Sequence, residues 1–354
     1  MTTLARRFRR FAALLAAPAL ALGACSDGNS NLPPREVVSV AVVLNSVDNT
    51  LTVTPVQGGT ATPVTIGLGA QGTPASIAVR GPRALVPLGT YPFAAIVNLS
   101  SGETTFVPLP ANSGATGVAF TGDFTAVVAN PGRNTVTPID VATGAVGPER
   151  PVGTYPQSIV ASGNRVFVIN ANLVNFTPAG PGSITVLNPQ LEAVRTIQLT
   201  GINPGAAVVR ENRLYVLNSG TFGGNNGSLS VVNLGTLREE RLVTGFGDFP
   251  GSLALGADGN LYVGVYGTGV LVWSPETGFV RGPSDPIVPA GGLPVSAVGI
   301  DPFGKLHTTN PGSCQTAGTS SRSAPDGTLE RTTSTGVCPF AIGFGLADAQ
   351  AQVD

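Results

Sequence analysis

The sequence is poor in the residues on which most metal centres and hydrolytic sites depend. Its 354 residues include one histidine, His307, and three cysteines. A single histidine excludes a metal site built from several histidines and argues against a Ser-His-Asp triad. A Gly-x-Ser-x-Gly elbow, a Walker-type phosphate loop and a Cys-x-x-Cys pair are all missing from the sequence. The sequence therefore offers no recognisable catalytic machinery of these classes.

Charge is also scarce, because only 11% of the residues are charged and Lys305 is the sole lysine. Four arginines lie within residues 6–10, so the rest of the chain is acidic overall. Such a body has no general attraction for phosphate backbones, and we expect no nucleic-acid partner. A hydrophobic content of 42%, in repeated runs of Val, Ile and Leu, indicates a packed core and not disorder.

The first 24 residues have the pattern of a signal peptide. Arginines within residues 6–10 are followed by an apolar stretch, 11–22, that is too short for a comfortable membrane span. Leu22-Gly23-Ala24-Cys25 then resembles the bacterial lipoprotein box. That resemblance implies a lipid on Cys25 and, with Ser26 next, sorting to the outer membrane or cell surface. An ordinary signal peptide with an incidental cysteine is the alternative. Residues 25–36 are rich in turn formers and predict a tether.

A short pattern of small residues, often opened by proline, returns seven times along the chain. It begins near positions 74, 115, 156, 204, 250, 294 and 339, at spacings of 41 to 48 residues. In the clearest unit, runs rich in β-branched residues lie at 158–161, 165–169, 183–187 and 195–199. A period of this length, with four strands in each repeat, is typical of a β-propeller. The sequence predicts an all-β, seven-bladed propeller over residues 37–348, with a C-terminal tail at 349–354.

The two ends of the predicted domain complement each other. Residues 42–45, 51–54 and 63–66 match the second, third and fourth strands of a blade, whereas 340–344 match a first strand. We therefore expect the ring to close by pairing the N-terminal strands with the C-terminal strand, which removes exposed sheet edges.

Several predicted strands end in asparagine, and this pattern suggests a family. Phe167-Val168-Ile169-Asn170, Tyr215-Val216-Leu217-Asn218 and residues 126–130 each end in asparagine, and Thr135-Val136-Thr137-Pro138-Ile139-Asp140 follows the last of these. In these segments the chain resembles the YVTN-type β-propeller repeats of many bacterial surface and periplasmic proteins. The resemblance covers residues 37 to about 348 and implies a fold more than an activity.

The recurring asparagines and the lone histidine have structural interpretations. The asparagines at strand ends are Asn45, Asn130, Asn170, Asn218 and Asn310. We interpret them as turn residues that bond the backbone, with a ring of ligand donors as the alternative. His307 aligns with Phe167 and Tyr215 in the second strand, which predicts a packing role instead of a catalytic one.

Carboxylates and the remaining cysteines also indicate structure. The aspartates Asp48, Asp123, Asp140, Asp258, Asp301 and Asp326 mostly occupy predicted turns, as in Ala257-Asp258-Gly259 and Pro325-Asp326-Gly327. We predict no cofactor and no metal, although loop oxygens could hold calcium without a recognisable motif. Cys314 and Cys338 would form a disulfide in an exported protein, with two buried thiols as the alternative.

The loops between second and third strands vary most in length. Three are predicted to be long, at 171–182, 219–227 and 311–327. With the segments that join the blades, they would form one face of the ring, where exposed aromatic and amide groups suit a ligand. The candidate binding residues on this face are Tyr91, Arg133, Tyr155, Asn172, Phe176, Phe222, Asn225, Phe249 and Tyr266. Tolerated loop insertion is the competing interpretation.

These observations favour one function over two others. The leading hypothesis is a lipid-anchored propeller of the cell envelope that binds a protein, peptide or glycan and catalyses nothing. The second is a metal-dependent propeller hydrolase or lyase of the lactonase type, with its site in the central channel. The third is a purely structural envelope component.

Overall fold

A computed structural model describes residues 36–58 and 62–349, which belong to one compact unit, and this part of the chain forms strands and loops without an α-helix. The predicted signal peptide, the predicted lipidation site Cys25 and nearly all of the predicted tether lie outside these residues. No helix in the part described is long and apolar enough to cross a membrane.

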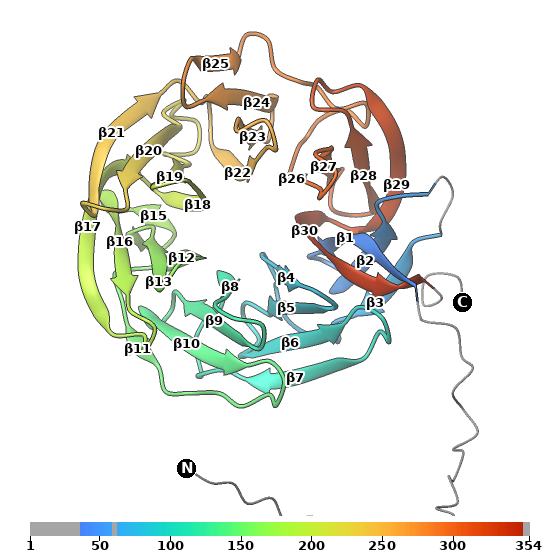
Figure 1. Cartoon of the computed structure of the whole chain (residues 1–354), viewed down its shortest axis with the longest axis horizontal. Helices are drawn as coiled ribbons and strands as arrows, with labels where there is room; N and C mark the ends of the chain where they lie inside the picture. Colours follow the sequence, from blue (N-terminus) through green and yellow to red (C-terminus); the bar gives the residue numbers. More distant parts are fainter. Residues whose placement is uncertain (1–35, 59–61, 350–354) are drawn as a thin grey trace, which may run out of the picture. The chain divides into compact units, whose positions relative to one another are not determined.

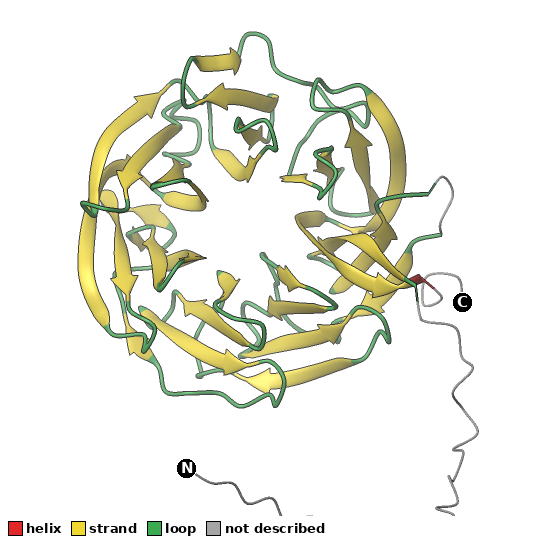
Figure 2. Cartoon of the chain, in the orientation of Figure 1, coloured by secondary structure: helices red, strands yellow, loops and turns green. Residues whose placement is uncertain are grey.

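Seven four-stranded antiparallel sheets stand as blades around a central axis (Figures 1 and 2). Blade 1 contains β4 (Ala78–Arg80), β5 (Arg83–Pro87), β6 (Phe93–Asn98) and β7 (Thr104–Pro108); blade 2 contains β8 (Val118–Phe120), β9 (Thr125–Asn130), β10 (Thr135–Asp140) and β11 (Arg150–Pro151). Blade 3 contains β12 (Pro156–Ser162), β13 (Arg165–Asn170), β16 (Pro181–Leu187) and β17 (Ala193–Ile202); blade 4 contains β18 (Pro204–Arg210), β19 (Arg213–Asn218), β20 (Ser228–Asn233) and β21 (Arg238–Thr244).

The remaining blades follow the same order from the centre outward. Blade 5 contains β22 (Pro250–Leu255), β23 (Leu261–Val265), β24 (Gly269–Ser274) and β25 (Gly278–Arg281); blade 6 contains β26 (Ala297–Ile300), β27 (Leu306–Asn310), β28 (Ala317–Ser323) and β29 (Leu329–Val337). Blade 7 joins β30 (Pro339–Asp348) to β1 (Val37–Asn45), β2 (Thr50–Pro55) and β3 (Val64–Gly67). The predicted seven-bladed propeller is confirmed.

Closure of the ring also occurs as predicted. β30 is the innermost strand of blade 7 and pairs antiparallel with β1, in a register that runs from Val37 opposite Asp348 to Asn45 opposite Pro339. Because one blade is built from both ends of the domain, neither end can leave without opening the ring. The predicted disulfide is present as well and joins Cys314 to Cys338, directly before β30.

The prediction of one long loop was wrong. Residues 311–327 were expected to form a single long loop, but β28 occupies Ala317–Ser323 within them and pairs with both β27 and β29. The strand was missed because its sequence, Ala-Gly-Thr-Ser-Ser-Arg-Ser, lacks the Val, Ile and Leu that mark the other third strands. Serine and threonine in this strand pack against a polar neighbour instead of an apolar one.

The core consists of separate apolar layers between blades. Alternate residues of each strand face opposite neighbours, so one sheet contributes to two layers. Among the described residues, six apolar clusters fill the spaces between blades 7 and 1, 1 and 2, 2 and 3, 3 and 4, 4 and 5, and 5 and 6. In the part of the chain that the structure describes, no such cluster lies between blades 6 and 7, where polar side chains take its place.

The recurring asparagines bond the second strand of a blade to its third strand, which differs from our prediction. The Nδ2 of Asn170 donates to the hydroxyls of Ser183 and Thr185 on the third strand, at 3.2 and 3.1 Å. Equivalent pairs of bonds occur at Asn45, Asn130 and Asn218, and all four side chains are fully buried. The interpretation as backbone-bonding turn residues was therefore wrong for these four. It is confirmed for Asn310 alone, whose amide binds the Gly291 and Gly292 carbonyls.

Three of the buried amides, those of Asn45, Asn170 and Asn218, each have a glycine beside them. Gly153, which enters blade 3, lies so close to Asn170 that an added Cβ would come within 2.6 Å of its Nδ2, and the Gly153 amide donates to Thr185 at 3.1 Å. Gly336 covers Asn45 in the same way and donates to Thr52 at 3.3 Å. These contacts link successive blades through hydrogen bonds that a side chain larger than glycine would break.

Candidate functional site

The candidate binding residues lie where inner strands begin and second strands end. In an antiparallel blade these two points fall at the same end of the sheet, which we call the loop face. Backbone hydrogen bonds fix the arrangement in blade 3, where the amides of Ala171 and Asn172 donate to the carbonyls of Tyr155 and Thr154 at 2.9 and 3.0 Å. The segments that connect blades are thus bonded to the loops that follow the second strands.

The loop of blade 3 presents an aromatic side chain to solvent. It contains the short hairpin of β14 (Leu173–Val174) and β15 (Thr177–Pro178), whose turn residues Asn175 and Phe176 have positive φ values of 50° and 62°. Phe176 is 81% exposed, and its ring meets Tyr155 edge-on at 6.1 Å between centroids. Asn172 closes the base of the loop by donating to the Pro181 carbonyl at 3.0 Å.

The loop of blade 4 repeats this arrangement with different residues. Phe222 is 87% exposed and meets Phe249 edge-on at 5.8 Å. The loop is held by Asn226, whose Oδ1 accepts from the Thr221 amide at 2.9 Å, and by the Asn225 amide, which donates to Asp248 at 3.4 Å. Edge-to-face pairing orients each ring and leaves most of the phenylalanine surface in water.

The two supporting aromatics share an unusual backbone. Tyr155 and Phe249 each precede the proline that opens an inner strand, and their φ values are 55° and 50°. Asn203 and Cys338 hold the same position with φ values of 54° and 61°. Positive φ is costly for a bulky residue, so the fold must over-determine this geometry. At two of the four positions it carries an aromatic ring beside a loop phenylalanine.

The other predicted residues are not brought into these pairs. Tyr91 stacks on Phe93 at 4.6 Å between centroids and packs against the cluster between blades 7 and 1. Arg133 forms a two-bond ion pair with Glu149, both bonds at 2.8 Å, and this hydrogen bonding lowers the pKa of Glu149. Tyr266 is 51% exposed in the turn after β23.

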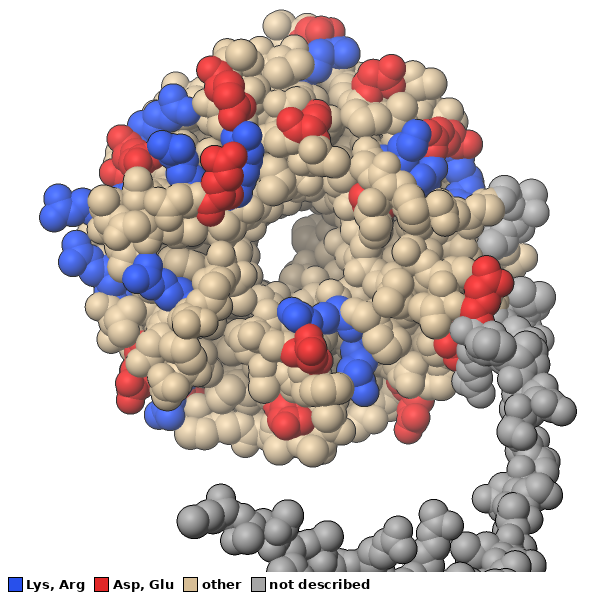
Figure 3. Space-filling view, viewed as in Figure 1, with Lys and Arg blue, Asp and Glu red and all other residues tan. Residues whose placement is uncertain are grey.

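The channel at the centre of the ring is poor in charged groups. Figure 3 shows an open passage with a mostly uncharged rim. Within the described ranges, the charged residues of the inner strands are Arg80, Arg210 and Asp348. Arg80 pairs with Asp123 at 2.8 Å and Arg210 with Glu276 at 2.7 Å, so both arginines are engaged. The inner strands of the described chain contribute no histidine and no carboxylate besides Asp348.

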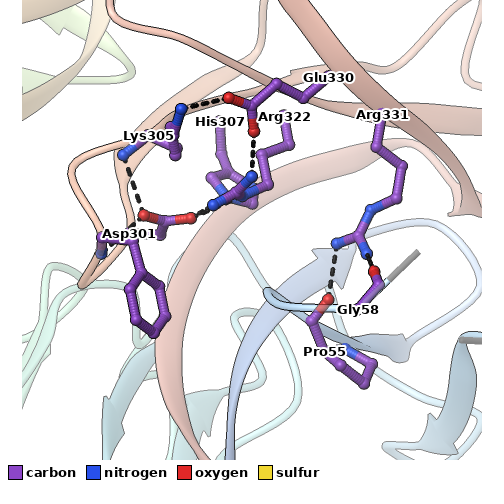
Figure 4. Close-up of polar contacts among 9 residues, drawn as sticks. Pro55, Gly58, Asp301, Lys305, His307, Arg322, Glu330 and Arg331 are labelled. Carbon is purple, nitrogen blue, oxygen red and sulfur yellow. Dashed lines mark hydrogen bonds and ion pairs between the residues drawn. The ribbon is translucent and has the colours of Figure 1, made fainter.

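A buried polar network, which sequence reasoning missed, lies between blades 6 and 7 (Figure 4). Asp301, in the turn between β26 and β27, has a fully buried side chain whose Oδ2 accepts from His307 Nε2 at 3.1 Å and from Arg322 Nε at 2.8 Å. Its Oδ1 accepts from the amides of Phe303 and Lys305, both at 2.9 Å. The turn role expected of aspartates is therefore only half of what Asp301 does.

Glu330 and Arg331 on β29 extend this network outward. Glu330 forms ion pairs with both Lys305 and Arg322. Arg331 reaches across to blade 7, where its guanidinium donates to the carbonyls of Pro55 and Gly58 at 2.6 and 3.1 Å. His307 also packs edge-on against Phe344 of β30 at 5.1 Å, so its predicted packing role is correct but incomplete.

Burial and charge set the pKa values in the network. Burial lowers the pKa of His307 below its usual range, and Arg322 and Arg331 act in the same direction, while Asp301 opposes the change. Burial alone would raise the pKa of Asp301, but hydrogen bonds from His307, the Lys305 amide and Arg322 hold that pKa well below its usual range. At neutral pH the network thus contains an ionised Asp301 and a neutral His307.

We expect the neutral His307 to make the protein sensitive to mild acid. In the unfolded chain histidine takes up a proton below about pH 6.5, whereas folded His307 resists it. The unfolded state then binds more protons, so the free energy of unfolding should fall as the pH drops from about 6.5. His307→Phe introduces an aromatic side chain without a titratable group, as Phe167 has at the aligned position. It should remove this dependence of the free energy of unfolding on pH. Urea unfolding at several pH values between about 7.5 and 4.5 measures it.

Two controls keep this test specific. Below about pH 4 the protonation of Asp301 adds a second loss of stability in both proteins, so the comparison stops above that range. Because His307 is the only histidine, its ring resonances in an NMR titration report its pKa directly. Parallel loss of stability in the parent and in His307→Phe between pH 6.5 and 4.5 would contradict the expectation.

Potential metal ligands are dispersed over the described residues. Nowhere in 36–58 and 62–349 do three His, Cys, Asp or Glu side chains come together in a way that could hold a metal ion. Asp140, Asp258 and Asp326 instead accept hydrogen bonds from backbone amides of their own turns, at 2.9, 3.0 and 2.9 Å.

Comparisons with known proteins establish the fold and no closer kinship. No protein-family model matches the sequence, and no curated protein matches it. Kuenenia stuttgartiensis hydrazine synthase superposes with a TM-score of 0.63 at 15% identity, over 81% of this chain and 92% of that chain. A functionally unknown protein from Desulfotomaculum acetoxidans gives 0.65 at 14% identity, over 86% and 98%.

A lyase also superposes on this chain, with a comparable TM-score and sequence identity. Virginiamycin B lyase from Staphylococcus aureus superposes with a TM-score of 0.58 at 14% identity, over 83% of this chain and 88% of that chain. At such identities the superposition shows a shared β-propeller architecture and transfers no activity.

Proposed function

We propose that the protein is an exported, lipid-anchored propeller of the cell envelope that binds a partner through its loop face and catalyses nothing. Cys25 carries the lipid, residues 25–36 form the tether, and the blades are diverged YVTN-type repeats. The partner is an envelope protein, a peptide or a glycan. The anchor holds the protein at the outer membrane or cell surface, where such partners are found.

The observation that carries this proposal is the exposure of Phe176 and Phe222. Each is more than 80% exposed, and each is oriented by a second aromatic ring and a hydrogen-bonded loop. Single exposed hydrophobic residues are common, but a pair of aromatic rings on an ordered loop offers apolar area that a partner can bury. Tyrosine and phenylalanine on rigid scaffolds are the usual anchors of binding surfaces, because little entropy is lost when they are covered.

The lyase or lactonase alternative has weaker support. The structural likeness to a lyase is one of fold alone. His307, the sole histidine, is buried between blades 6 and 7 and bonded to Asp301, and Asp348 is the one carboxylate that the inner strands of the described chain supply. A general acid or base in the channel would have to come from elsewhere.

We expect the double substitution Phe176→Ala with Phe222→Ala to weaken partner binding about tenfold without changing thermal stability. Purified wild-type and variant proteins would be compared against immobilised envelope proteins and cell-wall glycans. Phe303→Ala is the matched control, since Phe303 is 45% exposed in a turn between first and second strands, at the opposite end of its blade. Equal binding by all three proteins, or turnover of any tested ligand, would overturn the proposal.

The lipid anchor has a separate test. Growth with a clickable palmitate analogue should label the wild-type protein, and Cys25→Ala should abolish the label and release the protein from the membrane fraction. Labelling that survives Cys25→Ala would contradict the anchor but leave the binding hypothesis standing.

A further inference from the structure

A small polar cavity lies inside the interface between blades 6 and 7. Its volume is about 10 Å³, which is room for a single particle the size of a water molecule. The walls include His307, Arg322 and Arg331 together with the hydroxyl-bearing side chains of Thr54, Ser320 and Thr333. It occupies the one interblade space that has no apolar cluster among the described residues.

Two like charges face this cavity from adjacent strands. Arg322 on β28 and Arg331 on β29 are direct cross-strand partners, and both line the cavity. Such a pair of cations on one face of a sheet is destabilising unless something lies between them. The guanidinium groups diverge in Figure 4, with Arg322 directed to Asp301 and Glu330, and Arg331 directed to Pro55 and Gly58.

The charges around the cavity do not cancel. Lys305 and Arg322 are balanced by Asp301 and Glu330, which form ion pairs with them. In the described part of the chain Arg331 has no carboxylate partner, and its guanidinium donates to two backbone carbonyls instead. From the closing blade, the cavity receives only Ala41, Val43, Thr52 and Thr54, none of which titrates. One positive charge is left over in a partly desolvated space.

We propose that this cavity, which Arg322 and Arg331 line, is a binding site for a single monoatomic anion of chloride size. Guanidinium groups only donate and repel a metal cation, and hydroxyl groups can turn their O–H toward an anion, so the lining suits an anion. A phosphate or sulfate is too large for the volume. The anion would neutralise the surplus charge of Arg331 and join blade 6 to the blade that closes the ring.

The site has a thermodynamic signature that a water molecule in the same place would not produce. A ligand that binds only the folded state raises the unfolding temperature in proportion to the logarithm of its concentration. At constant ionic strength, replacing sodium gluconate by sodium chloride or bromide should therefore raise the midpoint progressively in the wild-type protein. The gain should grow below about pH 6.5, where an anion beside His307 favours its protonated form.

The variants test the position of the site. Arg331→Gln should abolish the halide dependence of the unfolding midpoint. Arg195→Gln is the control, because Arg195 lies on the exposed outer strand β17 and forms no ion pair with any described residue. This variant should retain the halide dependence. Halide dependence that persists in Arg331→Gln would refute the site.

Diffraction from wild-type crystals grown in sodium bromide decides the matter even if Arg331→Gln does not fold. We expect an anomalous bromide peak inside the cavity that Arg322 and Arg331 line. A well-ordered interface with a water molecule and no anomalous signal would overturn the proposal.

Discussion

Replacing Arg322 by methionine should lower the free energy of unfolding by about 3 to 5 kcal/mol, the usual cost of leaving a buried charge without its partner. Asp301 is fully buried and ionised, and Arg322, at 14% exposure, is the cation that contacts it at 2.8 Å. Methionine keeps much of the side-chain volume but supplies no donor. The neutral His307 already bonds Asp301 in the parent protein and cannot replace the lost charge. Urea unfolding at pH 7 followed by circular dichroism measures the loss.

The control for this substitution is a solvent-exposed ion pair on the protein surface. Arg80→Met breaks the pair with Asp123, whose side chains are 50% and 76% exposed, and should change stability little because exposed pairs contribute little. The double variant Arg322→Met with Asp301→Asn should recover part of the loss, since it removes the buried charge as well as its partner. Equal stability of Arg322→Met and the parent would show that Asp301 is not ionised in the folded protein.

Removing the disulfide is the second large effect we expect. The Cys314–Cys338 bond closes a segment with a sequence separation of 24 residues, for which loop entropy gives about 3.5 kcal/mol as an upper figure. It joins the loop after β27 to the first residue before β30, so it also limits separation of the closing strand. Cys314→Ser with Cys338→Ser should therefore unfold at markedly lower urea concentration than the oxidised parent.

Reduction of the parent protein provides the matched comparison. Dithiothreitol should bring the parent to the stability of the double-serine variant and leave the variant unchanged. Cys25→Ser in both proteins excludes intermolecular bonding through the third cysteine. If reductant has no effect on the parent while the variant is destabilised, the loss comes from the serine substitutions and not from the bond.

Both predictions concern one junction of the ring. The other six interfaces are filled with aliphatic and aromatic side chains, whose stabilisation is non-directional and tolerates small shifts. The junction between blades 6 and 7 depends on directed hydrogen bonds and ion pairs, and on a disulfide, at the place where the ring is closed by two chain ends. Polar contacts of this kind fix how blade 6 lies against blade 7 more strictly than apolar packing does, because each donor must meet its acceptor.

Strand positions and ring closure could be predicted because the signals are local. Segments such as 165–170 and 213–218 combine β-branched residues with flanking turn formers, and their regular return gives the number of blades. β28 was not predicted, because its serine and threonine residues form no hydrophobic pattern. A signal for the buried asparagines was present, since two Ser or Thr residues lie two positions apart on each following third strand, as at Thr135 and Thr137 after Asn130.

The amino-acid sequence by itself determined the seven-fold repeat and the sharing of one blade between both ends, and it favoured the pairing of Cys314 with Cys338 over two free thiols. These follow from periodic, short-range patterns and from a count of cysteines. Only the tertiary structure decided which rings meet on the loop face and which charges meet between blades 6 and 7. Arg331 and Pro55 are 276 residues apart in the chain, and their contact exists only because the closed ring brings β29 beside β2. No local pattern encodes such a partner, since the strands in between determine where each side chain arrives.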